Sequence, residues 1–226
     1  GPWRWRGGGV KEDIEANVGT LRQRSRDLYM NSPVARAALN RIQTNVVGPG
    51  LRLRANPDFD TLGITREEGG LWGRQAQREF ALWAESNDCD QVGLNNLYEL
   101  QQLALLSWLQ SGDVFALLPM GQTEGPPYRL RIQLIEADRI CGPGTTPWLP
   151  TPQTPMIRDG VEIDKSGRVV AYHIKNSHPL STWTADPDAN KWTRVPARGG
   201  VTGRRNILHL MVCERPEQYR GVPMLA

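Results

Sequence analysis

Histidine and cysteine, which can bind a metal ion or act as nucleophiles, are both scarce in this sequence. The chain has three histidines and three cysteines: His173, His178, His209, Cys89, Cys141 and Cys213. Only His209 and Cys213 are four residues apart. The segment between them is predicted to be a strand, where this spacing does not form the ligand pair that a helix would present. We therefore expect no metal site and no cofactor.

Carboxylates could supply acid–base chemistry or oxygen ligands, but their spacing is irregular. Glu136 and Asp138 follow the clearest predicted strand, and we interpret them as a turn or a salt bridge. The acids around Cys89, in the loop Ser86 to Asp90, lack the regular spacing of a calcium loop. No nucleophile elbow, Walker loop or dinucleotide fingerprint occurs, and no Gly-Lys-Ser/Thr follows Gly142-Pro143-Gly144. The sequence predicts no enzyme, although a fragment whose active site lies downstream is an open alternative.

Basic residues dominate the N-terminal quarter, whereas the whole chain is only mildly basic, with a net charge of +3 and a pI near 8.9. These arginines could form a solvated helix face in a larger assembly. They could also face phosphates, with Trp3 and Trp5 as stacking groups for single-stranded nucleic acid. Both interpretations remain open from the sequence. The five helical arginines concerned are Arg22, Arg24, Arg26, Arg36 and Arg41.

Length and composition indicate an ordinary folded domain. A chain of 226 residues buries roughly 70% of the surface that it exposes when unfolded. No apolar run approaches the roughly 20 residues that a membrane helix requires, and no signal peptide is evident. An odd number of widely spaced cysteines favours a reducing compartment over a disulfide framework.

The stretch from Leu21 to Arg54 predicts two helices and a strand. A helix should break at Asn31-Ser32-Pro33, because serine caps helices and proline suits the first helical position. The second helix should end at Gly48-Pro49-Gly50, and the alternating Leu51–Arg54 predicts a half-buried strand. The apolar stripe of the second helix comprises Val34, Ala38, Leu39, Ile42 and Val46. Residues 1–20, before this stretch, have no core-forming periodicity and are interpreted as an arm.

Further helices are predicted at about Arg66–Glu85 and Leu97–Gln110, followed by hairpins. The strands expected are Val114–Met120, Tyr128–Leu134, Val161–Ile163, Val169–Ile174, Trp192–Val195 and Ile207–Val212. Helical spacing predicts that Trp72, Ala76, Phe80 and Trp83 form a buried stripe rather than a stacking platform. The order of elements predicts an α+β fold, with helices packed on antiparallel hairpins or a small mixed sheet.

Several ordered motifs resemble the lambda-type bacteriophage portal proteins. They are Arg24-Ser25-Arg26-Asp27-Leu28, Asn31-Ser32-Pro33-Val34-Ala35-Arg36, Asn45-Val46-Val47-Gly48, Leu97-Tyr98-Glu99-Leu100-Gln101, Ser111-Gly112-Asp113-Val114-Phe115, Gln133-Leu134-Ile135-Glu136-Ala137-Asp138-Arg139-Ile140, Gly160-Val161-Glu162-Ile163-Asp164 with Ala171-Tyr172-His173-Ile174, and Arg215-Pro216-Glu217-Gln218-Tyr219-Arg220-Gly221-Val222-Pro223. The last motif is the most specific. The resemblance covers roughly residues 21–226 and corresponds to the wing of a portal subunit.

The resemblance implies a structural, non-catalytic subunit of a ring, typically of about twelve copies, at one vertex of the viral head. Double-stranded DNA would be packaged and ejected through the ring, with terminase and head-completion or tail adaptor proteins as partners and no membrane. The expected divisions are residues 1–20 (arm), 21–214 (wing) and 215–226 (a bent connection toward a stem), in a longer protein. We expect the chain alone to be a monomer or a weak oligomer. The interface candidates are Arg22, Arg24, Arg26, Arg36, Arg41, Arg215, Tyr219 and Arg220.

Overall fold

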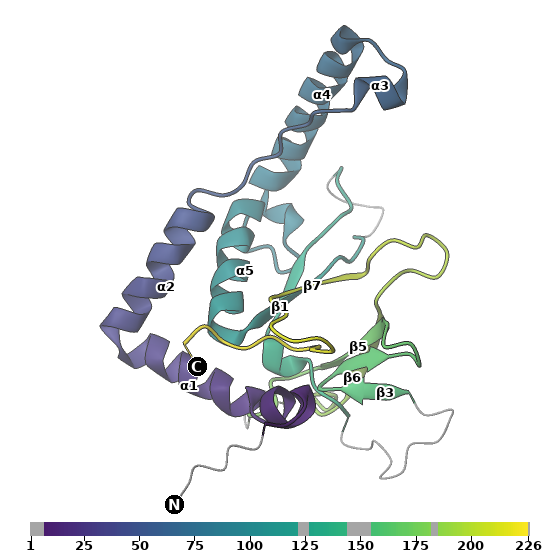
Figure 1. The fold of residues 1–226 in the computed structure, drawn as a ribbon. Helices are drawn as coiled ribbons and strands as arrows, with labels where there is room; N and C mark the ends of the chain where they lie inside the picture. The colour runs from purple at the N-terminus through teal and green to yellow at the C-terminus, as the bar shows by residue number, and fades with distance from the viewer. Residues whose placement is uncertain (1–6, 122–126, 144–154, 182–184, 226) are drawn as a thin grey trace, which may run out of the picture.

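The computed structural model describes residues 7–121, 127–143, 155–181 and 185–225. Helices lie on one side of two small antiparallel sheets, and one long helix extends away from both (Figure 1). The predicted α+β class is confirmed. No described helix is long and apolar enough to cross a membrane.

Helices α1 (Val18–Asn31) and α2 (Pro33–Val46) meet at a sharp bend and pack on α5 (Leu97–Ser111). The predicted break is confirmed, because Ser32 caps α2 by accepting a hydrogen bond from the Ala35 amide at 3.3 Å. A capping box of Asn96 and Glu99 begins α5. Such caps satisfy amides that a helix end leaves unpaired, so the sequence predicts these helix starts well.

The apolar stripe that the sequence predicts on α2 is mostly uncovered. Leu39 is buried, but Val34 is 80% exposed and Val46 is 56% exposed. The reason is that α1 and α5 cover only a narrow part of α2, which lies at the edge of the molecule (Figure 1). An apolar pattern predicts a helix face that packs against another element. The described chain covers only part of this face.

The predicted strand at Leu51–Arg54 is wrong, because this segment is extended but pairs with no other strand of the described chain. Side chains satisfy its backbone instead. The Leu51 amide donates to Gln101 Oε1 at 2.6 Å, and the Gln101 side chain donates back to the Leu51 carbonyl at 3.2 Å. The alternation of leucine and arginine predicts extended backbone, but it does not identify the hydrogen-bonding partner.

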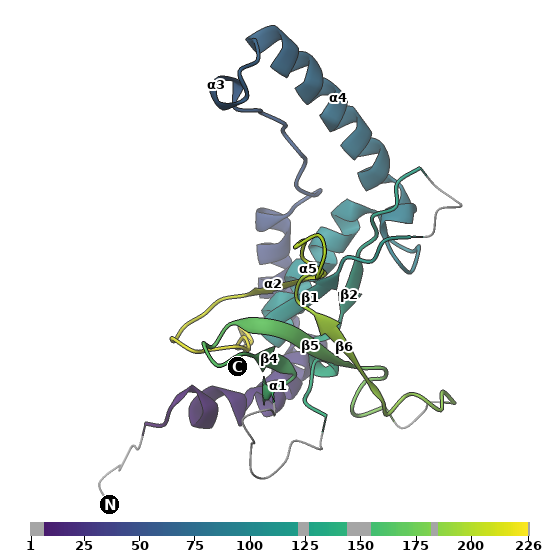
Figure 2. The same ribbon diagram turned by 90° about the vertical axis from the view of Figure 1, so that its right-hand side faces the viewer.

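Helices α3 (Phe59–Leu62) and α4 (Arg66–Glu85) form a projection, here called the limb (residues 58–85). Both views show the limb extending beyond the sheets, with only the C-terminal end of α4 against the body (Figures 1 and 2). A capping box of Thr65 and Glu68 begins α4. At the tip, Phe59 packs so closely on Gly69 that an added Cβ would lie 2.3 Å from the ring.

Of the two tryptophans on α4 that are predicted to be buried, one is buried and the other is exposed. Trp83 is 8% exposed, and its indole Nε1 donates to the Leu130 carbonyl at 2.8 Å. Trp72 is 60% exposed, so its predicted burial is wrong. The periodicity of α4 is that of a buried face. Only the C-terminal end of the helix lies against the body, and Trp72 lies in its N-terminal half.

Trp83→Ala is expected to lower the free energy of unfolding by about 3–5 kcal/mol, since it opens a cavity and leaves the Leu130 carbonyl without its donor. Trp72→Ala is the matched control and should change the stability of the isolated chain by less than about 0.5 kcal/mol. Urea titrations of the two variants measure the difference. Equal losses would contradict the placement of α4.

The strands form two antiparallel sheets, ordered β2-β1-β7 and β3-β4-β5-β6. The strands are β1 (Asp113–Leu117), β2 (Gln133–Ile135), β3 (Met156–Arg158), β4 (Val161–Ile163), β5 (Val169–Lys175), β6 (Trp192–Pro196) and β7 (Ile207–Met211). The predicted hairpin at residues 161–174 is confirmed as β4–β5, and the predicted pairing of β1 with the following strand is confirmed as β1–β2. Two short 3-10 turns, η2 (Asn87–Cys89) and η3 (Ala137–Arg139), precede α5 and follow β2.

The strand predicted at Tyr128–Leu134 is shorter than expected, because its backbone changes partners. The Arg131 amide donates to the Pro119 carbonyl at 3.0 Å, whereas the Ile132 amide donates to the Cys89 carbonyl at 2.7 Å. Regular pairing with β1 therefore begins only at Gln133. Alternation predicts the extended backbone but not the exchange of partners.

The main core lies between the two sheets. Phe115 of β1 is fully buried and lies edge-on to Tyr172 of β5, with ring centroids 5.7 Å apart. The other buried members of this cluster are Ile135, Ala137, Ile140, Val161, Ile163, Ile174 and Ile207. A second cluster joins the base of α4 to α5 through Trp83, Ala84, Cys89, Leu97 and Leu100.

Residues before α1 are more ordered than an unpacked arm. Lys11–Glu15 forms a short π-helix (η1), in which Ile14 is 7% exposed. An ion pair joins Asp13 to Arg215 at 2.8 Å. The residues of the nucleic-acid alternative, Trp3 and Trp5, lie outside the described residues.

Candidate functional site

A buried aspartate, Asp113 at the start of β1, is the centre of a polar junction. Gly112 precedes it in a left-handed conformation with φ of 86° and ends α5. Asp113 Oδ2 accepts from Arg220 Nε at 2.7 Å and from the Gly221 amide at 3.1 Å. Arg22 Nη2 donates to Oδ1 at 3.3 Å. One carboxylate thus joins α1, β1 and the C-terminal segment.

Arg220 is fully buried, with every guanidinium nitrogen donating. Nη1 donates to the Ile140 carbonyl and the Asp159 carbonyl, each at 2.7 Å, and to Asp159 Oδ2 at 2.8 Å. Nη2 donates to the Ala137 carbonyl at 2.7 Å. A buried charge is tolerated only when it is paired and hydrogen-bonded. Arg220 therefore joins the C-terminal segment to both sheets.

Two glycines let the backbones approach at this point. A Cβ on Gly221 would lie 1.8 Å from the Gly112 carbonyl oxygen, and one on Gly112 would lie 2.4 Å from Gly221. Side chains at either position would separate the end of α5 from the C-terminal segment. The two glycines thus permit the Gly221 amide to reach Asp113.

Burial and neighbouring charges shift the pKa values of the groups at the junction. Burial alone would raise the pKa of Asp113, but Arg220, the adjacent His209 and Arg22 hold this pKa well below its usual range. Burial and the neighbouring Arg220 lower the pKa of Arg22 to about 10, so it stays charged at neutral pH. Burial also lowers the pKa of His209, whose Nε2 lies 3.4 Å from Asp113 Oδ2 without forming a well-aligned hydrogen bond.

The low pKa of Asp113 predicts acid sensitivity. A carboxyl whose pKa is lower in the folded state stabilises the protein above its unfolded pKa, about 3.9 for aspartate. That stability is lost as the pH falls through and below this value. The urea midpoint should therefore decrease once the pH is lowered below about 4. The decrease should be less steep in Asp113→Asn. Identical slopes in the two proteins would contradict the assignment.

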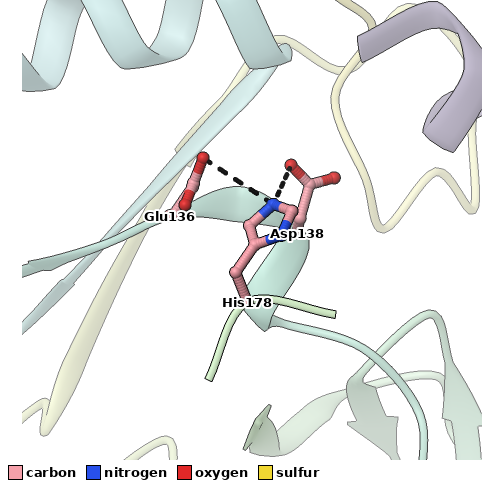
Figure 3. A group of neighbouring side chains, drawn as sticks. All are labelled: Glu136, Asp138 and His178. Carbon is pink, nitrogen blue, oxygen red and sulfur yellow. Dashed lines mark ion pairs between the residues drawn. The ribbon is translucent and has the colours of Figure 1, made fainter. Parts of the chain in front are cut away.

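A second, more exposed cluster lies beside this junction. His178 Nε2 lies 3.6 Å from Asp138 Oδ2 and 3.9 Å from Glu136 Oε1 (Figure 3). Arg26 of α1 pairs with the same two acids, donating to Asp138 and lying 3.6 Å from Glu136. The expectation that Glu136 and Asp138 form a turn or a salt bridge is confirmed, because Asp138 lies in η3 and both acids pair with Arg26.

The geometry alone would allow this cluster to bind a divalent cation, since one ligand atom from each of the three side chains lies within 4.8 Å of the others. The local charge opposes it. Arg26 already pairs with both carboxylates, and Arg22 Nη1 adds a second positive charge 3.8 Å from Asp138 Oδ1. A cation would have to displace a guanidinium, so we interpret the cluster as an extension of the ionic junction.

The predicted interface residues separate into buried and exposed groups. Arg22 is 2% exposed and Arg220 is fully buried. These two therefore cannot offer the surface contacts that were expected, because both are used within the chain. Three others also have partners: Arg26 in the cluster above, Arg215 with Asp13, and Tyr219, whose hydroxyl donates to the Gly167 carbonyl at 2.9 Å. The remaining three, Arg24, Arg36 and Arg41, are exposed, and of these Arg36 donates to the Tyr29 carbonyl at 3.2 Å.

Sequence reasoning missed Asp113, Asp159 and His209 as members of one site. A signal was present, because several motifs that resemble portal proteins supply the junction. Ser111-Gly112-Asp113 provides the acceptor, Gln133 to Ile140 provides two carbonyls, and Arg220-Gly221 provides the donors. Segments far apart in sequence thus meet at one buried ionic centre.

The most buried polar residues of this α+β fold thus bind one another. The sequence matches the family described as phage portal protein, lambda family, over residues 1–226, and the chain belongs to that family. The family resemblance inferred from the motifs is confirmed.

Three curated relatives are portal proteins. The chain is 27% identical over 179 residues to a probable portal protein of Halomonas phage phiHAP-1, covering 79% of this chain and 33% of the relative. It is 24% identical over 201 residues to portal protein B of Escherichia phage lambda, covering 88% and 36%. It is 23% identical over 200 residues to the portal protein of Escherichia phage N15, again covering 88% and 36%. The chain thus spans about a third of the length of these relatives.

Proposed function

We propose that this chain is the wing of a portal subunit, one of a ring of copies at a vertex of the phage head. Residues 21–214 would form the wing, residues 1–20 an arm and residues 215–226 the connection toward a stem. The match to the portal family along the whole chain carries the proposal. The family's motifs supply the central ionic junction, which agrees with a structural role for that part of the protein.

In this proposal double-stranded DNA enters and leaves the head through the ring, and terminase and head-completion or tail adaptor proteins dock elsewhere on it. The subunit would assemble in the host cytoplasm, become part of the virion and catalyse no reaction. A conduit should not retain phosphates, because each one neutralised adds affinity and salt dependence. The internal pairing of Arg22, Arg26 and Arg220 supports this, since it leaves fewer cations for DNA.

The C-terminal segment is central to the proposal. The described residues 212–225 contain no helix, as the predicted bend requires. Arg220 and Gly221 fasten this segment to Asp113. A C-terminal segment fixed in this way would hold the wing at one angle to the stem. Identical copies in a closed ring require such a constant angle.

Mass measurement of the complete portal polypeptide tests the proposal. The expected result is a single closed species of uniform copy number, seen as rings by electron microscopy. A monomer at every concentration, or hydrolytic activity that depends on residues of this chain, would contradict it.

A nucleic-acid-binding module is the second candidate, favoured by the exposed arginines of α1 and α2. Arg24 and Arg41 are exposed and form no side-chain hydrogen bond or ion pair within the described parts of the chain. Filter binding over a salt series separates the candidates. The portal proposal predicts weak binding with a shallow slope, whereas tight single-strand binding with a steep slope would favour the module.

A further inference from the structure

We infer that the limb tip of one copy packs on the outer face of α2 in the next copy around the ring. This inference rests on the proposed ring, and it assigns the subunit contact to two surfaces. The limb tip is the surface formed by α3 and the first half of α4. The outer face of α2 is the part of that helix turned away from α1 and α5.

The limb tip exposes three large apolar side chains to solvent. Leu62 is 60%, Leu71 57% and Trp72 60% exposed. The limb helices that bear these residues extend beyond the sheets (Figures 1 and 2). An exposed tryptophan beside two exposed leucines is typical of a protein contact, where aromatic side chains contribute most of the binding energy.

The outer face of α2 is apolar and has no partner in the described chain. Val34, Ala38 and Arg41 follow one another at helical spacing, and all three are exposed. Val34 and Ala38 belong to the apolar stripe recognised in the sequence, whereas Arg41 lies outside it. Small side chains such as alanine allow a second helix to approach to about 8–10 Å between axes. The stripe therefore suits a helix such as α4.

The charges of the two surfaces are opposite. Residues 58–75, which include α3 and the first half of α4, carry four acids against two arginines, a net charge of −2. The exposed charges of α1 and α2 are Arg24, Arg36 and Arg41 against Asp27, a net charge of +2. Two limb tips would repel each other, and so would two α2 faces, whereas a limb tip and an α2 face attract.

This asymmetry requires a head-to-tail contact. When one surface of a subunit binds a different surface of the next, the contacts either close into a ring or continue as a filament. A second copy of this chain therefore fits both surfaces at once. Nucleic acid fits only the basic face of α2, and it leaves the acidic, apolar limb tip unpartnered.

Charge reversal in the complete portal polypeptide tests the pairing. Glu67 and Arg41 are exposed and have no side-chain partner in the described residues. Glu67→Arg and Arg41→Glu should each weaken association between neighbouring subunits by about tenfold, because each places like charges in contact.

Mixing the two variants should restore assembly, because the copies can alternate in a ring of even number. The reversed limb tip of one variant then meets the reversed α2 face of the other, so these contacts join opposite charges again. Every remaining contact keeps the original pair, Glu67 against Arg41. Only a head-to-tail contact between these surfaces gives rescue in a mixture of two defective proteins.

An apolar truncation gives a second measurement. Leu71→Ala should also weaken association by about tenfold. Leu94→Ala is the matched control, since Leu94 is 72% exposed but lies in a loop outside both surfaces. Thermal melting of each variant, at concentrations where subunits are separate, should match the unsubstituted chain.

The outcomes distinguish this inference from the proposed function. Loss of rings in the single variants with rescue in the mixture supports the contact. Rings that assemble normally in all three variants, or that fail to recover in the mixture, overturn the contact alone and leave the portal proposal standing. If the unsubstituted polypeptide forms no ring, the proposed function falls and this inference falls with it.

Discussion

Arg220→Met is expected to lower the free energy of unfolding by about 3–5 kcal/mol, because removing one partner of a buried ion pair leaves the other charge uncompensated. Asp113 would keep only Arg22 as a close cation, and the carbonyls of Ala137 and Ile140 would lose their donor. Methionine keeps much of the side-chain volume, so the loss reports the polar contacts more than a cavity.

Two controls accompany this variant. Arg215→Met removes an ion pair whose arginine side chain is 42% exposed, and it should cost less than about 1 kcal/mol. A double-mutant cycle with Asp113→Asn should give a coupling energy of about 0.5–3 kcal/mol, as expected for directly bonded groups. A loss for Arg220→Met no larger than that for Arg215→Met would mean that Arg220 does not hold the junction.

Gly221→Ala is expected to cost more than about 4 kcal/mol, or to prevent folding of the C-terminal segment onto the sheets. The added Cβ would lie 1.8 Å from the Gly112 carbonyl oxygen, and neither backbone can move without breaking contacts to Asp113. The cause is steric alone, since Gly221 does not have a positive φ.

Gly200→Ala is the matched control, because no other atom lies within 4 Å of the position of its Cβ and its φ is not positive. It should leave the urea midpoint nearly unchanged or raise it slightly, since alanine restricts the unfolded chain. Equal midpoints for the two alanine variants would show that the close approach at Gly112 is absent.

Local features of the sequence predict helix ends and hairpins correctly. Ser32 with Pro33, and the span Arg66–Glu85, follow from capping and periodicity, which depend on neighbours in sequence. The β4–β5 hairpin follows from alternation around a short turn. These elements are predictable because their partners lie a few residues away.

Errors arise where the partner is distant or absent. The sequence places Arg220 at the surface, yet this residue binds Asp113 at a separation of 107 residues. Helical spacing predicts that Trp72 is core and that Val34 lies on an apolar helix face. Periodicity identifies an apolar face but not what covers it, and the described chain covers neither residue.

Electron microscopy of the complete portal polypeptide tests the central claim most directly. We expect a closed ring in which each copy keeps this fold, with Arg220 buried against Asp113 and the limb tip against α2 of the neighbouring copy. Copies that stay separate, or a ring in which residues 215–225 are detached from Asp113, would contradict the account.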